Sequence, residues 1–249
     1  MKKFLMFLII AAFALVPFAV SADTTQMMTD ADKLFNDRQG SLEDFEKAIA
    51  LYKKVLEQEP ENFEALWQCA RANRYYGDKA KINKVDDWKK ACAKYGKEGM
   101  NYAQKAIDLK PDNPAGYYFF ALSVGVYADG VSILKALKEG LKGKTQKSFE
   151  KVLELDKNFQ EGSGILGLGR FWAVLPWPMK SKKKAMKYYR EFQATPYFGK
   201  EPESIIYLSE LLIDMGGKKR KAEAKDLLGK FNAPNPYFQD IKDGLMKKL

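Results

Sequence analysis

Apolar and polar residues alternate with a helical period along most of this chain. From Asp30 onward, apolar residues recur at spacings of three and four, and the prolines fall between the periodic segments. No segment shows the strict two-residue alternation that is typical of a half-buried β-strand. The pattern therefore predicts an all-α fold built from successive helices.

Three of the predicted helices end in the same way, with an apolar tail and an acidic step followed by proline and asparagine. The ending occurs at residues 55–62, 106–113 and 152–159, with Lys157 in place of proline in the third. It resembles the end of a tetratricopeptide repeat, whose second helix closes on such a turn. The next first helices are then expected to begin at Phe63, Pro114 and Gln160.

Each of these first helices carries a small residue at its eighth position, where it lets the two helices of a hairpin approach closely. The small residues are Ala70, Ala121 and Gly167. The sequence therefore predicts tetratricopeptide-like helical hairpin repeats, stacked in a right-handed solenoid with helical insertions.

The repeat frame predicts one helical-repeat domain over residues 23–249. Its hairpins are expected near 30–60, 63–110, 114–156, 160–195 and 202–231, with a C-terminal cap over 232–249. In the first hairpin, we expect a short helix from Asp30 to Asp37 and a second helix that begins at a capping box, Ser41-Leu42-Glu43-Asp44.

Some spacings exceed the repeat length and predict insertions. One insertion covers residues 79–86 and follows Gly77, which is expected to end its helix. Another covers residues 130–143 and has helical periodicity, so it is expected to lengthen the second helix of its hairpin. Residues 175–181 contain two prolines and are expected to form a loop. Residues 202–215 and 218–231 are expected to form the last pair of helices.

The N-terminal residues have the pattern of a secretory signal peptide over residues 1–22. Lys2 and Lys3 precede an apolar run at residues 4–20, and small residues lead to a cleavage point after Ala22. Cleavage predicts a periplasmic protein of about 227 residues; the alternative is an uncleaved membrane anchor. No cysteine directly follows Ala22, so no lipid anchor of the bacterial lipoprotein kind is predicted.

The composition narrows the possible functions. The chain contains no histidine, which excludes Ser/His/Asp and Cys/His catalytic pairs and histidine-ligated zinc. We therefore expect a protein that is not an enzyme and has no cofactor or metal. The formal net charge of +10 reflects either a solvated lysine face or an anionic partner, and an exported chain is not expected to bind nucleic acid.

Only two cysteines occur, Cys69 and Cys92, and they fall on consecutive predicted helices. Because those helices run antiparallel, the two thiols are expected at a similar level, where an oxidising compartment permits a disulfide. The alternative is that both are small, buried core residues.

The inner face of the solenoid is expected to be lined by the first helices. The inward positions are Trp67, Arg71, Arg74, Tyr118, Leu122, Leu168 and Phe171. Such an aromatic and apolar surface with two guanidinium groups suits a ligand that has an apolar body and a carboxylate. Alternatively, these residues pack against the insertions or a neighbouring subunit.

The middle of the chain also carries motifs of a known family, at residues 116–121, 125–130, 133–143 and 167–176. Over about residues 40–230, the sequence resembles the T component of tripartite ATP-independent periplasmic (TRAP) transporters. The resemblance implies degenerate tetratricopeptide hairpins in the periplasm, association with the transporter's periplasmic solute-binding protein, an apolar or organic-acid ligand, and a homo-oligomer.

Carried over by position, Tyr127 and Asp129 match the family's tyrosine-alanine-aspartate step, and Arg170 matches its glycine-arginine element. Leu175-Pro176 matches its leucine-proline element, but Trp177 begins a segment that replaces the usual glycine-aspartate loop. With Tyr75, which lies beside the inward Arg74, these residues complete the candidate binding set.

Three functional hypotheses follow from the sequence. The first is a periplasmic accessory of a TRAP-type transporter that binds the solute receptor and an apolar or carboxylate ligand. The second is a general scaffold for envelope proteins that uses helix-in-groove contacts. The third is an enzyme that uses carboxylates or lysine, and the absence of histidine argues against it.

Overall fold

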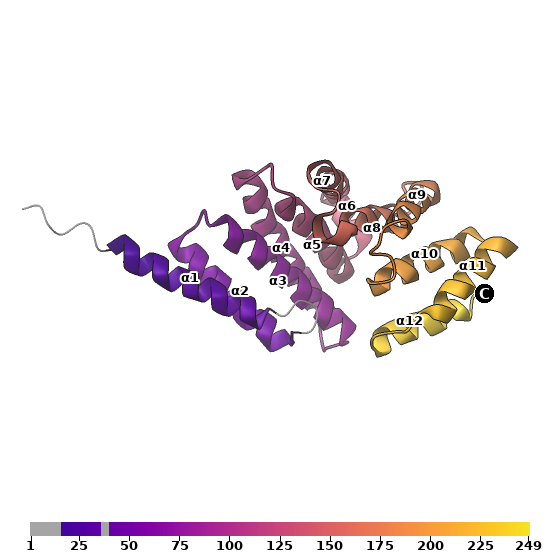
Figure 1. Ribbon diagram of the computed structural model, residues 1–249, viewed down its shortest axis with the longest axis horizontal. Coiled ribbons are helices and arrows are strands. Elements are labelled where there is room, and N and C mark those ends of the chain that lie inside the picture. Colours follow the sequence, from indigo (N-terminus) through magenta and orange to yellow (C-terminus); the bar gives the residue numbers. More distant parts are fainter. Residues whose placement is uncertain (1–15, 36–39) are drawn as a thin grey trace, which may run out of the picture.

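The computed structural model describes residues 16–35 and 40–249 of the chain, with side chains from residue 23 onward. In these ranges every regular element is a helix (Figure 1), which confirms the all-α class. The helices are α1 (Val16–Leu34), α2 (Leu42–Gln58), α3 (Phe63–Ile82), α4 (Trp88–Leu109), α5 (Pro114–Val131), α6 (Ile133–Lys138), α7 (Leu141–Leu155), α8 (Phe159–Val174), α9 (Lys182–Gln193), α10 (Pro202–Met215), α11 (Lys218–Lys230) and α12 (Pro236–Met246).

The helices form antiparallel hairpins that follow one another along the long axis of the molecule (Figure 1). The hairpins are α1–α2, α3–α4, α5–α7, α8–α9 and α10–α11, and the short helix α6 lies between α5 and α7. The first helices α3, α5, α8 and α10 each contact the next one and form an inner row. The C-terminal helix α12 packs on α10 and α11.

Helix α1 differs from the expected first helix. It begins at Val16 and ends at Leu34, so it starts earlier than the short helix predicted from Asp30. Thr24 Oγ1 donates a hydrogen bond of 2.6 Å to Glu59 at the end of α2, which holds α1 along its partner. Residues 1–15, most of the predicted signal peptide, lie outside the described residues. Within the described ranges, no helix is both long and apolar enough to cross a bilayer.

Side-chain caps begin several helices where the sequence predicts them. The capping box of α2 is formed: the Asp44 backbone N–H donates to Ser41 Oγ at 3.1 Å, and the Ser41 N–H donates to the Asp44 carboxylate at 3.0 Å. Asn62 and Asn113 cap α3 and α5 by accepting backbone N–H donors at 3.0 Å. These caps satisfy N–H groups that a helix leaves unpaired in its first turn, so they fix where each hairpin begins.

At both predicted insertions, the helix boundaries differ from those that the sequence predicts. Gly77 does not end its helix, because α3 continues to Ile82 and takes in the first half of the insertion. A Cβ atom at Gly77 would lie 2.4 Å from Val126 Cγ1, so this glycine permits close packing against α5. The second insertion forms the separate helix α6. It does not lengthen α7, because Ser132 (φ 113°) and Gly140 (φ 74°) interrupt the helical backbone on both sides.

The C-terminal third follows the predicted boundaries closely. Helix α10 spans Pro202–Met215, α11 begins at Lys218, and two glycines with positive φ, Gly216 and Gly217, form the turn. Residues 175–181 form the predicted loop between α8 and α9. These boundaries were predictable because proline and glycine act on the backbone locally, whatever the helices later pack against.

Candidate binding cavity

The inner row of helices lines a cavity of about 700 Å³, to which α12 contributes a further wall. This volume lies within the range of small-molecule binding sites. The apolar part of the wall includes Tyr118 and Leu122 on α5, Phe149 on α7, Leu166 and Phe171 on α8, and Phe238 on α12. Segments distant in the sequence thus meet around one hollow on the inner side of the repeats.

More than half of the candidate binding residues line this cavity. They are Arg74, Tyr75, Tyr118, Leu122, Asp129, Arg170 and Phe171. They come from the first helices α3, α5 and α8, because equivalent positions of successive repeats face the same side of a solenoid. Their binding role stays a prediction, but the structure brings them together.

Two candidates on α3 face other parts of the molecule. Trp67 stacks on Phe119 with ring centroids 5.6 Å apart and donates its indole N–H to Glu64 at 2.9 Å. The Arg71 guanidinium lies 3.9 Å from the centroid of the Phe35 ring, next to the end of α1. The predicted pair of inward guanidinium groups from α3 is therefore wrong, since only Arg74 reaches the cavity.

Three further candidates also lie outside the cavity wall. The Tyr127 hydroxyl donates to the Glu139 carboxylate at 3.0 Å and packs α6 against α5. Leu168 is fully buried in the central hydrophobic cluster, so its side chain does not reach the cavity. Trp177 lies in the loop after α8 and is 89% exposed.

The cavity combines its apolar wall with charges of both signs. Five cations and five carboxylates line it: Arg74, Lys81, Lys142, Arg170 and Lys248, and Asp78, Asp129, Glu201, Glu203 and Glu210. The lining is formally neutral, so its net charge does not favour an anion. At Arg74, Lys81 and Arg170 a ligand carboxylate must compete with the internal carboxylate that already pairs with the cation.

Three ion pairs place the cations. The Nζ of Lys81 lies 2.7 Å from Asp129, joining α3 to α5, whereas Arg74 pairs with Asp78 within α3 at 3.5 Å. Burial opposes the charge of Lys81, but the Asp129 carboxylate outweighs it and raises the pKa of this lysine. Both cations are therefore held at the α3 side of the cavity.

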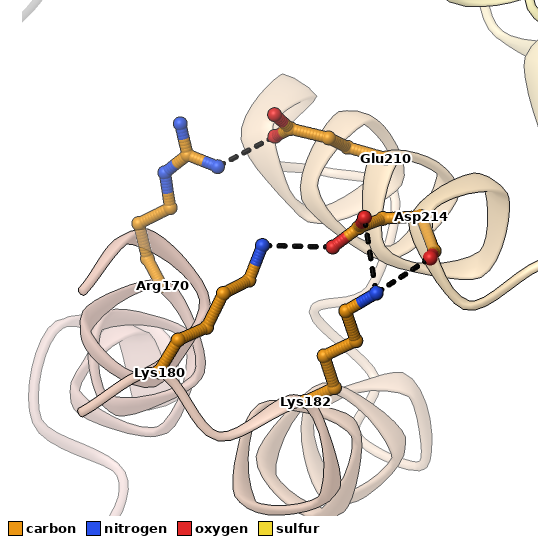
Figure 2. A network of polar contacts seen from close by, with 5 residues as sticks. All are labelled: Arg170, Lys180, Lys182, Glu210 and Asp214. Atoms are coloured by element: carbon orange, nitrogen blue, oxygen red, sulfur yellow. Dashed lines mark hydrogen bonds and ion pairs between the residues drawn. The ribbon is translucent and has the colours of Figure 1, made fainter. Parts of the chain in front are cut away.

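Arg170 on α8 forms the third pair. Its guanidinium lies 2.6 Å from the Glu210 carboxylate (Figure 2) and 4.3 Å from the centroid of the Tyr207 ring. Burial opposes the charge, but Tyr207 and Glu210 outweigh it and raise the pKa of Arg170 above its ordinary value. This pair also lines a second hollow of about 420 Å³, which continues toward Lys180 and Asp214.

Some lining residues are not predicted by the sequence. For Glu210 and Ile206 a signal exists, because they take the ninth and fifth positions of a first helix that begins at Pro202, as the cavity residues Leu122 and Tyr118 do in α5. For Tyr237 and Phe238 on α12 the sequence contains no such signal. This terminal helix lies outside the repeats, so repeat positions do not predict what its side chains contact.

The two cysteines are free thiols, so the predicted disulfide is absent. Asn73 Nδ2 lies 3.5 Å from Cys69 Sγ, whereas the Cys92 thiol contacts the Gly77 carbonyl at 3.2 Å. Gly77 follows Cys69 by eight residues, or about 12 Å along the helix, which is too far for a disulfide. Burial raises the pKa of both thiols to about 12.

In the described part of the chain, no three potential His, Cys, Asp or Glu ligands gather around a metal position.

Comparison with known proteins places the chain in a family. A family model described as regulator of microtubule dynamics protein 1-3 matches residues 27–177, which include α2 to α8. A search of curated proteins found no match. Among solved structures, a thermophilic tetratricopeptide-repeat protein of Thermus thermophilus is similar, with a TM-score of 0.59 and 17% identity over 90% of this chain and 98% of that one. A de novo designed helical repeat protein aligns with a TM-score of 0.31 and 15% identity over 93% and 98% of the two chains.

The Thermus protein shows that the fold is tetratricopeptide-like, as the repeat frame predicts. The matching family is not the T component of TRAP transporters, so a transporter role stays a prediction from the sequence resemblance. Because the family model spans more than half of the residues, the chain belongs to the regulator of microtubule dynamics protein 1-3 family.

Proposed function

We propose that this chain is an exported binding protein whose inner cavity takes an organic acid with an extended apolar body. The observation that carries the proposal is the combination, in one hollow of about 700 Å³, of an aromatic and aliphatic wall with cations from α3, α7 and α8. The family's name refers to microtubule dynamics. Since the first 22 residues predict export, the proposed function does not depend on microtubules.

In this proposal the apolar part of the ligand lies between Tyr118 on α5 and Phe171 on α8. Both side chains line the cavity, and each removes apolar ligand surface from water. The carboxylate binds the guanidinium of Arg170, whose planar fork can donate two hydrogen bonds to it. Because Glu210 already occupies part of this fork at 2.6 Å, the ligand gains only the difference between the two carboxylates. The aromatic wall therefore supplies most of the affinity.

The test compares dodecanoate with dodecanol in thermal unfolding and calorimetry. Dodecanoate is expected to raise the melting temperature of the wild type more than dodecanol does, since a ligand that binds only the folded state stabilises it. Arg170→Gln should weaken dodecanoate binding roughly tenfold, in line with loss of a charge-assisted pair. Glu210→Gln is the matched control and should strengthen it, because the competing carboxylate is removed. Equal binding of acid and alcohol, or weakening by both substitutions, would contradict the assignment of Arg170.

The accessory role in a TRAP-type transporter is the finer form of this proposal. Its support is the sequence resemblance over about residues 40–230 together with the tetratricopeptide-like fold. Pull-down from an envelope extract should then recover a periplasmic solute-binding protein, and the gene should lie beside permease and receptor genes. Recovery of several unrelated envelope proteins and no solute receptor would favour a general scaffold, which the fold equally permits.

A further inference from the structure

A basic patch lies where α9 and α11 begin. It consists of Lys180, Lys182, Lys183, Lys184, Lys218, Lys219, Arg220 and Lys221. The segments 177–187 and 215–221 that carry it contain no acidic residue. Neither α9 nor α11 has an acidic residue in its first turn, where a helix normally favours negative charge. The helix dipoles therefore add to the positive potential of the lysines.

Asp214 at the end of α10 holds the two lysines that lie before α9 and at its first position. It lies 2.8 Å from Lys180 Nζ and 3.1 Å from Lys182 Nζ, and Lys182 also donates to its backbone carbonyl at 2.7 Å (Figure 2). Lys218, the first residue of α11, follows Asp214 by only four residues, so the lysines of α11 begin one short turn of chain after this carboxylate. One carboxylate leaves the patch strongly positive.

Trp177 lies in the same loop as Lys180 and is 89% exposed. A single exposed apolar side chain is ordinary on a protein surface. Here, however, it is the largest side-chain type, held between two prolines and followed by lysines at residues 180 and 182–184. Tryptophan beside lysines is typical of the membrane interface, where the indole lies at headgroup level and the cations meet anionic lipids.

We propose that this basic patch and Trp177 form a docking surface for an anionic lipid bilayer. The lysines supply attraction to anionic headgroups without a fixed geometry, and Trp177 inserts its ring between them. The patch borders the second hollow through Lys180, but docking does not require a ligand in the binding cavity. It lies at the far end of the molecule from α1 (Figure 1), so the docked chain meets the membrane through its C-terminal half.

The experiment uses the full chain with vesicles of brominated lipids, which quench a tryptophan that enters the bilayer interface. With equimolar phosphatidylcholine and phosphatidylglycerol, emission of the wild type should be quenched, and added salt should reverse the effect. With phosphatidylcholine alone, Trp177 should not be quenched. Trp177→Phe keeps an aromatic side chain and should lose the quenching. Residues 1–22 contain no tryptophan, so they cannot produce this signal themselves.

Charge variants test the basic patch. The double variant Lys183→Glu with Lys219→Glu should lower the partition coefficient of the protein onto the vesicles, as measured by quenching, by at least about 25-fold. Each lysine near an anionic surface contributes roughly fivefold to this coefficient. The control, Lys97→Glu with Lys144→Glu, changes two exposed lysines on α4 and α7 and should retain quenching. Absence of quenching in the wild type, persistence in Trp177→Phe, or equal quenching in the two double variants would overturn the proposal. Binding of an acidic protein or an oligonucleotide through the patch, with no vesicle effect, would also overturn it.

Discussion

At the scale of single residues, close helix contact in this fold depends on missing side chains. A Cβ atom at Gly96 on α4 would lie 2.5 Å from the backbone nitrogen of Tyr127 on α5. At Gly167 on α8 it would lie 2.4 Å from the Phe149 ring. The repeat frame predicts the small residue at position 167, because that position recurs in every hairpin. It does not predict Gly96, which reflects the particular approach of α4 to α5.

Gly96→Ala is therefore expected to lower the free energy of unfolding by about 1–3 kcal/mol, since its methyl group meets backbone atoms that cannot rotate away. The matched control is Gly143→Ala on α7, where an added Cβ contacts nothing within 4 Å. That substitution should raise stability by about 0.4–1 kcal/mol through helix propensity. Urea denaturation measures both, and equal effects of the two substitutions would contradict the close approach of α4 and α5.

At the scale of helices, local signals decide which boundaries can be predicted. The capping box at Ser41 and the glycine turn before α11 act within a few residues, so the sequence predicts both. Gly77 is also a glycine, but it does not form a turn as the glycines before α11 do. It lies inside a continuous helix, where it makes room for Val126. A glycine that ends a helix and one that makes room for a neighbour cannot be distinguished until the neighbour is known.

Helix α12 is the element most weakly joined to the rest. It packs on α10 and α11, and an exposed ion pair of 3.3 Å between Lys84 and Asp240 joins it to the turn after α3. Such an exposed pair contributes about 0–1 kcal/mol. Phe238 is 7% exposed and belongs to a small C-terminal cluster that includes Phe231. The cavity wall that α12 forms should therefore open without unfolding of the repeats.

Phe238→Ala should remove about 3–5 kcal/mol of the packing free energy that holds α12 in place, so that this helix opens locally. Amide hydrogen exchange is then expected to accelerate over residues 236–246, with α5 still protected. Phe119→Ala is the comparison, because Phe119 is 1% exposed in the central cluster and its loss should speed exchange across α3 to α8 together. If Phe238→Ala accelerated exchange in α5 as much as in α12, the C-terminal helix would be part of one cooperative unit.

At the scale of the whole molecule, repetition makes much of the site predictable. Because equivalent positions of successive first helices face one side, Arg74, Tyr118 and Phe171 could be assigned to a common surface from spacing alone. The pairing of Glu210 with Arg170 could not be predicted, since it depends on how the first helices of two adjacent repeats pack against each other. The wall formed by α12 could not be predicted either, as it depends on how far the solenoid curves before the chain ends.

The most direct test of the central claim, that the inner cavity binds a carboxylate with an apolar body, locates the bound ligand. A dodecanoate analogue with a diazirine in its alkyl chain is irradiated with the native protein, and mass spectrometry identifies the labelled residues. Labelling is expected at the cavity wall around Tyr118, Phe149 and Phe171, with competition by unlabelled dodecanoate. Labelling spread over the outer helices, or unaffected by the competitor, would contradict the account.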